Sequence, residues 1–247
     1  MVPPDRLPDS VSAVLPAFNE ARVIATTVRR THAALLASGV RSFEIVVVDD
    51  GSTDGTRAEM ELVQQELHDV RAISHPRNRG YGAALRTGFD TASNDAIFLM
   101  DSDGQFDPAE LELLLEHWDG RTVVCGYRAH RSDPFARRVS NRAFFAIVNA
   151  RLGSTARDVN CAFKLFPRQL GCGLASDGAL ISTELLVRAR DEGYRIVNVA
   201  VSHSPRRTGT ATGSNPRVVA RAFKELWELD RRRRLEQAQA ALDTASR

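Results

Sequence analysis

The chain has 247 residues, of which 43% are hydrophobic and 26% are charged, and this size and composition suit one well-buried globular domain. Its formal net charge of +2 and its lack of an aromatic-interleaved basic stripe argue against nucleic acid as a partner. The three cysteines, Cys125, Cys161 and Cys172, are odd in number and not closely paired, which argues against a disulfide framework or a cysteine metal cluster and favours a reduced cytoplasmic setting.

Residues 1–10 contain three prolines and lack the apolar core of a signal peptide, so we expect a disordered tail there. No segment of the sequence approaches the ~18 to 20 consecutive apolar residues of a membrane span. From Val11 onward, short apolar strands alternate with helical periodicity, which is typical of a mainly parallel sheet covered by helices. We expect strands over residues 11–15, 43–48, 70–74, 96–100, 122–126 and 195–201, and helices over about 23–36, after Pro108 and over about 181–190.

Polar turns follow the first two expected strands. The first strand ends in Pro16-Ala17-Phe18-Asn19-Glu20, and the second ends in Asp49-Asp50-Gly51-Ser52. A helix cap needs one aspartate, so two aspartates followed by a glycine that lets a ligand approach the backbone indicate more than a cap. Open α/β sheets bind ligands at the edge where such turns meet.

The segment after the third expected strand, residues 78–88, is rich in glycine and alanine. It fits neither the dinucleotide-binding pattern nor the P-loop pattern, so we expect neither a dinucleotide cofactor nor nucleoside triphosphatase activity. Its small residues are expected to let a helix pack closely beneath the site. The six histidines fit no metal or catalytic spacing and are interpreted as ordinary residues.

The buried strand over residues 96–100 runs directly into Asp101-Ser102-Asp103-Gly104-Gln105. The carboxylates of Asp101 and Asp103 and the amide oxygen of Gln105 form an all-oxygen ligand set, which suits Mg²⁺ or Mn²⁺. An ion there would in turn hold a diphosphate. The pattern Asp-x-Asp alone favours capping of the next helix, so the metal-site interpretation rests on the neighbouring motifs.

Basic residues are concentrated after the expected strand over residues 122–126, because residues 128–142 contain five arginines and only one aspartate. This segment is interpreted either as a solvated face or as an anion-binding flank. A second basic loop, residues 203–214, contains Arg206 and Arg207, whose guanidinium groups suit phosphate. The apolar stripe of residues 218–227 has basic flanks and a tryptophan, so it either packs on its own domain or lies in a membrane interface.

Taken together, Pro16–Glu20, Val48–Ser52 and Asp101–Gln105 resemble the inverting glycosyltransferases of family 2, and most closely the branch that transfers mannose or glucose to dolichol or polyprenol phosphate. The resemblance covers roughly residues 11–229. It implies a single α/β domain of the GT-A fold, which is Rossmann-like with a mainly parallel mixed sheet flanked by helices. The implied division is a nucleotide-sugar half over about 11–126, an acceptor half over about 127–229 and a charged extension over 230–247.

The resemblance also implies roles for individual residues. The implied nucleotide-sugar contacts are Pro16, Phe18, Glu20, Val48, Asp50, Asp101, Ser102 and Asp103, with Val48 and Asp50 at the base; the implied metal ligands for Mg²⁺ or Mn²⁺ are Asp101, Asp103 and Gln105; the implied acceptor-phosphate contacts are Arg137 and Ser140; and the implied catalytic residues are Asp103, Arg128, Arg206 and Arg207. Arg128 resembles the arginine that faces the phosphates, and Arg206 or Arg207 resembles the arginine of the closing loop.

Two features depart from the family pattern. Ala162 stands where this branch often has glycine, and the sequence shows no counterpart of the carboxyl-terminal membrane helices of many relatives. We therefore expect a cytoplasmic protein whose membrane contact, if it has one, is peripheral and at the inner face.

The residues and the resemblance together predict metal-dependent transfer of a hexose from a UDP- or GDP-sugar to a polyprenyl phosphate, and the resemblance implies that the transfer is inverting. An acceptor phosphate is already anionic at neutral pH and needs positioning rather than a base. The alternative is transfer to a hydroxyl of a soluble small molecule or glycan, which would need a carboxylate base, with Asp158, Asp177 and Glu184 as candidates. A non-catalytic nucleotide-sugar-binding module is disfavoured because all three metal ligands are present, and nucleotidyl transfer is disfavoured because Pro16–Glu20 is not a glycine-rich basic signature.

Overall fold

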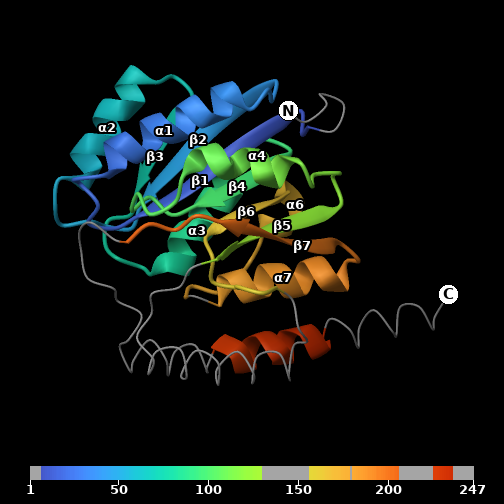
Figure 1. Cartoon of the computed structure of the whole chain (residues 1–247). Coiled ribbons are helices and arrows are strands. Elements are labelled where there is room, and N and C mark those ends of the chain that lie inside the picture. The colour runs from blue at the N-terminus through green and yellow to red at the C-terminus, as the bar shows by residue number, and fades with distance from the viewer. Residues whose placement is uncertain (1–6, 130–155, 179, 206–224, 236–247) are drawn as a thin grey trace.

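The computed structural model describes residues 7–129, 156–178, 180–205 and 225–235. At its centre is a seven-stranded sheet with the order β3-β2-β1-β4-β6-β5-β7 (Figure 1). The strands are β1 (Ser10–Ala17), β2 (Ser42–Asp49), β3 (Val70–Ser74), β4 (Ala96–Met100), β5 (Thr122–Arg128), β6 (Phe163–Pro167) and β7 (Arg195–Val201). Neighbouring strands pair in parallel, except that β6 runs antiparallel to both β4 and β5. The predicted α/β class with a mainly parallel mixed sheet is confirmed.

Helices cover both faces of this sheet (Figure 1). They are α1 (Ile24–Ala37), α2 (Thr56–Glu66), α3 (Tyr81–Thr91), the 3₁₀ helix η2 (Pro108–Glu110), α4 (Leu111–Leu115), α6 (Arg168–Gly171) and α7 (Ile181–Asp191). Successive side chains of a strand point to opposite faces. Accordingly, Ala13 and Leu15 of β1 pack with α1, α2 and α4, whereas Val14 packs with α3, α6 and α7.

Helix α3 lies close to the sheet because it carries a glycine at the contact. A Cβ atom added at Gly88 would lie 2.4 Å from Cγ1 of Val14, a distance that packed carbon atoms do not adopt. The expectation that small residues in 78–88 allow close helix packing is therefore confirmed. The close packing also brings the first residue of α3, Tyr81, to the edge where β1 and β4 end.

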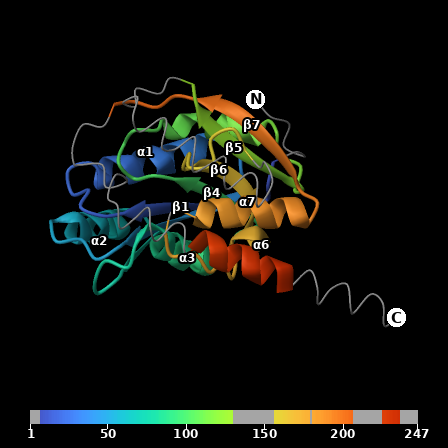
Figure 2. The ribbon, with the colours of Figure 1, turned by 90° about the horizontal axis from the view of Figure 1, so that it is seen from below.

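Residues 225–235 form a helix that lies along α7 on the side away from the sheet (Figures 1 and 2). Leu226 and Leu229 pack against Leu180 and Val187 in a small apolar cluster of their own. The predicted boundary between residues 229 and 230 falls inside this helix, because its inward face continues past that point. Among the residues that the structure describes, no helix is both long enough and apolar enough to cross a membrane.

Most elements match the sequence expectations; no bounds were predicted for α2, and two further features differ. Strand β1 begins at Ser10 and Leu7 packs against the core, so described structure starts before residue 11. Strand β6 and the short helix α6 were not predicted. The apolar run that forms β6 is interrupted by Lys164, which is fully buried, and a buried lysine weakens the hydropathy pattern by which a strand is recognised.

Candidate active site

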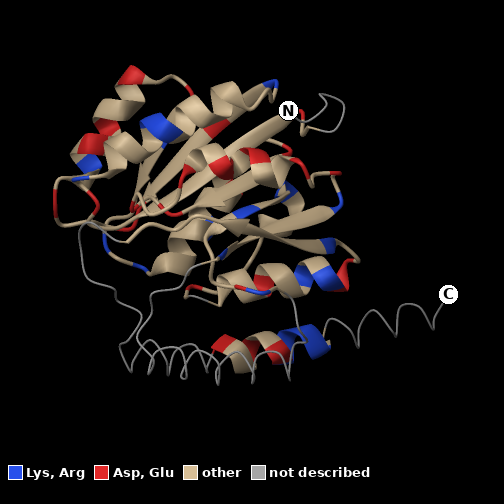
Figure 3. Ribbon diagram, viewed as in Figure 1, with Lys and Arg blue, Asp and Glu red and all other residues tan. Residues whose placement is uncertain are grey.

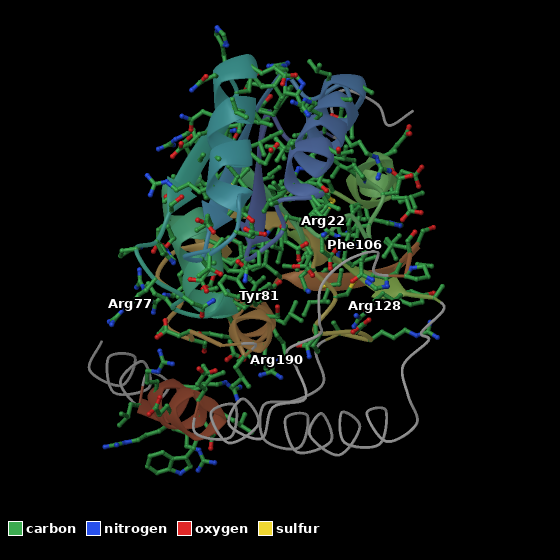
Figure 4. The ribbon with its side chains drawn as sticks, turned by 90° about the vertical axis from the view of Figure 1, so that its left-hand side faces the viewer. Arg22, Arg77, Tyr81, Phe106, Arg128 and Arg190 are labelled. Carbon is green, nitrogen blue, oxygen red and sulfur yellow. The ribbon has the colours of Figure 1, made fainter. Side chains whose placement is uncertain are left out.

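The loops that follow β1, β2, β3, β4, β5 and β7 meet at one edge of the sheet, because these strands are parallel. The segment before β6 reaches the same edge because β6 runs the opposite way. Acidic residues lie there, at the ends of β2 and β4 (Figure 3). Figure 4 looks onto this edge and labels Arg22, Tyr81, Phe106 and Arg128 around it. The candidate site is this edge.

The loops after β1 and β2 are tied together by hydrogen bonds. The main-chain amide of Asn19 donates to Oγ of Ser52 at 2.8 Å, and the side-chain oxygen of Asn19 accepts from the amide of Thr53 at 2.9 Å. Asn19 adopts a φ of 56°, in the left-handed region that asparagine tolerates better than most residues. This arrangement leaves the ring of Phe18 39% exposed beside the loop, where a flat ligand can contact it, and buries Glu20.

Two side chains expected at the nucleotide instead lie inside the protein. Val48 is fully buried and packs in the core between the sheet and α3. Ser102 is 2% exposed, and its hydroxyl group donates to the carbonyl oxygen of Pro16 at 2.7 Å, which joins the loop after β4 to β1. A nucleotide could therefore contact Val48 and Ser102 chiefly through their main-chain atoms, and their binding roles stay predictions.

Asp50 is buried and holds the start of α3. Its Oδ1 atom accepts hydrogen bonds from Nδ1 of His75 at 2.8 Å and from the amide of Arg79 at 2.9 Å, and its Oδ2 atom accepts from the amide of Gly80 at 2.8 Å. The predicted contact with a nucleotide base would have to be made in addition to these three bonds.

Asp101 and Asp103 stand one residue apart at the end of β4. The hydroxyl group of Tyr81 donates to Oδ1 of Asp101 at 3.2 Å, and the amide of Gln105 donates to Oδ1 of Asp103 at 3.1 Å. Burial and the negative charge of Asp103 raise the pKa of Asp101 to about 7. Burial and the charge of Asp101 raise the pKa of Tyr81 well above its ordinary value, so Tyr81 stays a hydrogen-bond donor.

This carboxylate pair fits a divalent cation. The two carboxylates repel each other, so one of them keeps a proton near neutral pH. A cation that replaces this proton would stabilise both carboxylates in their charged form. The side-chain N–H group of Gln105, the predicted third ligand, donates to the carbonyl oxygen of Ser204 at 2.7 Å. The predicted metal contact would use the other side-chain atom, the amide oxygen. Within the described ranges, no group of three or more His, Cys, Asp or Glu side chains is arranged to hold a metal, so the predicted set depends on Gln105.

Arg128, at the end of β5, is held by Asp158. Its Nε and Nη2 atoms donate to the two carboxylate oxygens at 2.8 and 3.0 Å, a bidentate pair with side chains 18% and 6% exposed. The fully buried amine of Lys164 donates to the carbonyl oxygens of Val159 and Cys161 in the turn that carries Asp158. The positive charges of Lys164 and Arg128 both act to lower the pKa of Asp101, against the larger effects of burial and Asp103.

The three candidate bases all have structural partners. Asp158 pairs with Arg128, and Asp177 pairs with Arg86 at 3.1 Å. Glu184 is 5% exposed and accepts hydrogen bonds from the amides of Ala175 and Ser176. Each of the three carboxylates is therefore engaged by other groups of the protein.

Four predicted residues lie outside the described ranges: Arg137, Ser140, Arg206 and Arg207. Three described residues were missed by the sequence interpretation: Tyr81, His75 and Lys164. For His75 a signal existed, because it follows β3 directly at the edge where ligands bind. For Tyr81 the signal appears only when the chain is folded, since its partner Asp101 belongs to a different element. For Lys164 the partners Val159 and Cys161 are close in the sequence, but the full burial of the lysine is visible only in the folded chain.

Comparison with known proteins adds sequence relatives to this geometry. A model of the family described as "Glycosyl transferase family 2" matches residues 12–180. Glycosyltransferase AglD of Haloferax volcanii is 33% identical over 207 residues, which cover 79% of this chain and 33% of that protein. Undecaprenyl-phosphate 4-deoxy-4-formamido-L-arabinose transferase of Pseudomonas aeruginosa is 32% identical over 218 residues, which cover 87% of this chain and 63% of that protein. The chain thus spans less than two thirds of the length of either relative.

Solved structures show the same fold. Glucosyl-3-phosphoglycerate synthase from Mycobacterium tuberculosis in complex with uridine diphosphate matches with a TM-score of 0.63 at 23% identity, over 88% of this chain and 80% of that chain. The same enzyme in complex with Mn²⁺, UDP-glucose and phosphoglyceric acid matches with a TM-score of 0.62 at 22% identity, over 88% and 79% of the two chains. At this level of identity the likeness concerns the fold.

Proposed function

The chain belongs to glycosyl transferase family 2 and has the GT-A fold, and from this premise we propose that it transfers a sugar from a nucleotide-sugar donor to a polyprenyl phosphate with the help of Mg²⁺ or Mn²⁺. The observation that carries the proposal is the Asp101–Asp103 pair at the ligand-binding edge, within the electrostatic influence of Arg128. The names of two relatives support it, since both are glycosyltransferases and one is named for undecaprenyl phosphate.

In this proposal the described residues divide the work by charge. Asp101, Asp103 and Gln105 would hold the metal ion, which when bound supplies Lewis-acid stabilisation of the departing nucleoside diphosphate. Arg128, oriented by Asp158, would add positive charge that stabilises the diphosphate. Phe18, which is partly exposed after β1, offers a face for the nucleotide base.

The acceptor side follows from the engaged carboxylates. An acceptor phosphate attacks as an anion and needs no general base, whereas a hydroxyl acceptor does. Asp158, Asp177 and Glu184 already hold Arg128, Arg86 and two main-chain amides, respectively. Phosphate is therefore the acceptor group that these contacts favour. The proposal also includes Arg137 and Ser140 as contacts of the acceptor phosphate, and Arg206 or Arg207 as the arginine of the loop that closes over the phosphates.

The proposal includes peripheral contact with an anionic membrane surface on the cytoplasmic side. The outward face of helix 225–235 carries Trp227 at 58% exposure and Leu235 at 61%, and Arg231 lies over the indole ring at 5.9 Å. An exposed aromatic ring beside basic residues suits the interface of anionic lipids. Trp227→Ala is expected to reduce cosedimentation with vesicles that contain phosphatidylglycerol, and unchanged cosedimentation would contradict this contact.

The test of the proposed reaction is release of nucleoside diphosphate from UDP- and GDP-sugars with Mn²⁺ or Mg²⁺, with and without a short polyprenyl phosphate. We expect one donor to be consumed only when the lipid phosphate is present. Asp103→Asn should lower kcat/KM at least about a hundredfold, the scale of losing a group that acts on the transition-state charge. The matched control is Asp69→Asn, an exposed aspartate before β3 at the opposite edge, which should keep full activity.

Two results would count against the proposal. Release that ignores the lipid phosphate and requires a hydroxyl compound would favour the alternative acceptor class. An Asp103→Asn variant as active as the wild-type protein would contradict the metal assignment.

A further inference from the structure

A buried hydrogen-bond chain lies behind the site, between the end of β2 and the start of α3. Nδ1 of His75 and Oδ1 of Asp50 are 2.8 Å apart, and Nε2 of His75 and Oγ1 of Thr87 are 2.9 Å apart. Both His75 and Asp50 have side chains that are 5% exposed. Since a carboxylate only accepts hydrogen bonds, Nδ1 of His75 carries the hydrogen in this pair.

Asp50 passes this orientation to the main chain. Its two oxygens accept from the amides of Arg79 and Gly80, the two residues that precede α3. Gly80 has a φ of 106°, a conformation that only glycine adopts readily, so the chain turns sharply into the helix here. The main chain on the other side is also constrained, because a Cβ atom at Gly51 would lie 2.3 Å from the carbonyl carbon of Arg77.

The turn delivers Tyr81, the first residue of α3, to the carboxylate pair. Its hydroxyl group donates to Oδ1 of Asp101. In Figure 4 Tyr81 lies among the loops of the site, whereas Arg77 from the same segment points outward. The backbone of α3 is held from behind as well, because the amide of Ala83 donates to the carbonyl oxygen of Asp177 at 3.2 Å.

We propose that His75 is a positioning residue, which fixes the carboxylate of Asp50, through it the amides of Arg79 and Gly80, and through these the Tyr81 hydroxyl group on Asp101. The positioning of Asp50 and Tyr81 by His75 does not depend on the proposed function. Only its expected effect on metal binding by Asp101 rests on that function. Hydrogen bonds to a ligating carboxylate orient it, and their loss weakens metal binding.

Two substitutions of His75 separate this role from simple packing. In asparagine the side-chain nitrogen occupies about the place of Nδ1, so His75→Asn keeps a donor for Asp50 and loses the bond to Thr87. In glutamine the nitrogen occupies about the place of Nε2, so His75→Gln keeps the bond to Thr87 and loses the donor for Asp50. Glutamine is closer to histidine in length, so a packing role predicts that His75→Gln is the milder change.

The first readout is amide hydrogen exchange of Arg79 and Gly80, which needs no ligand. We expect exchange about tenfold faster in His75→Gln, the upper range for one lost hydrogen bond, and close to the wild-type rate in His75→Asn. Exchange in the core strands β1 and β4 should be unchanged in both variants, which shows that both are folded. Equal rates in the two variants, or faster exchange in His75→Asn, would overturn the proposal.

The second readout is the affinity for Mn²⁺ alone, measured by electron paramagnetic resonance. It is compared in a double-mutant cycle that combines Tyr81→Phe with each substitution of His75. Tyr81→Phe should weaken Mn²⁺ binding about three- to tenfold in the wild-type and His75→Asn backgrounds and have little further effect in His75→Gln. Additive effects in His75→Gln would contradict the connection between His75 and Tyr81. If wild-type protein does not bind Mn²⁺, the metal assignment fails, and the exchange rates still decide the role of His75.

Discussion

The ionisation of Asp101 connects the site to the stability of the protein. Its pKa is raised to about 7 by burial and by Asp103, whereas an unfolded chain releases this proton near its ordinary value of 3.8. Between these values the folded state binds more protons than the unfolded state, so this group makes stability fall as pH rises. The slope from one proton is at most about 1.4 kcal/mol per pH unit.

The prediction is that metal-free Asp101→Asn gains stability relative to the wild-type protein as pH rises from 4 to 7. The measurement is urea unfolding of both proteins at several pH values without metal. Wild-type binding of Mn²⁺ should strengthen over the same interval, because the ion replaces the proton of Asp101. Parallel stability profiles for the two proteins would show that Asp101 does not hold its proton in the folded state.

The sequence was informative at the residue scale where chemistry follows a strand end. Asp101 and Asp103 were located as a pair because they stand directly after a continuous apolar strand. Val48 and Ser102 share the same motifs, yet their side chains face the core or the neighbouring strand, because side-chain direction alternates along the chain. Tyr81 joined the site through a contact between α3 and the loop after β4 that no local pattern encodes.

At the scale of elements, the position of α3 depends on glycine contacts on two sides. A Cβ atom at Gly82 would lie 2.4 Å from the carbonyl carbon of Asp177 and 2.6 Å from the carbonyl oxygen of Gly178, so Gly82→Ala must push the helix and this loop apart. We expect a loss of about 1–3 kcal/mol of unfolding free energy, the range for overpacking. Because Tyr81 precedes this contact, donor binding should weaken as well.

Gly55→Ala is the matched control for this prediction. Its added Cβ atom would meet Ala21 Cβ at 3.6 Å, which is an ordinary contact. Denaturant unfolding should show a smaller loss, under about 1 kcal/mol, for this helix-start position. Equal losses in the two variants would indicate that α3 and the loop can separate without strain.

Most elements could be predicted because their apolar period is strong. The β-branched run of β2 and the uninterrupted run of β4 gave strand positions within a residue or two. Strand β6 was not predicted because Lys164 interrupts its apolar run and because its place depends on two partners that lie well before it in the chain: β4 at residues 96–100 and β5 at residues 122–128. Local periodicity carries no signal for such a pairing.

At the scale of the whole molecule, helix 225–235 is fastened to α7 by two kinds of contact. Leu226 and Leu229 bury apolar surface, and Arg233 donates to both oxygens of Asp191 at 2.6 and 3.1 Å, in the basic end of the helix seen in Figure 3. The run of four arginines was expected to form a charged extension, yet Arg232 and Arg233 face inward toward Glu184 and Asp191.

Leu226→Ala should therefore loosen this helix before the sheet. A truncation of a buried leucine costs about 2–5 kcal/mol, and here the cost falls on a small peripheral cluster. Hydrogen exchange should rise across residues 225–235 and stay unchanged in β1 and β4. Trp227→Ala, the neighbouring change on the outward face, should leave exchange as in the wild-type protein. A uniform rise across the sheet in Leu226→Ala would mean that the helix is integral to the main core.

The antiparallel strand β6 has a consequence for folding of the protein during its synthesis on the ribosome. Strands β4 and β5 are neighbours in the sequence but are separated in the sheet by β6, which is translated only after both. Until residues 163–167 emerge, the edge of β4 is an unpaired row of main-chain groups with fully buried residues such as Phe98 beside it. Translation proceeds at roughly 5–20 residues per second, so the main-chain groups along β4 stay unpaired in the nascent chain for several seconds. Completion of the sheet thus requires the late insertion of β6 between two strands that precede it in the chain, a long-range step of the kind that slows folding.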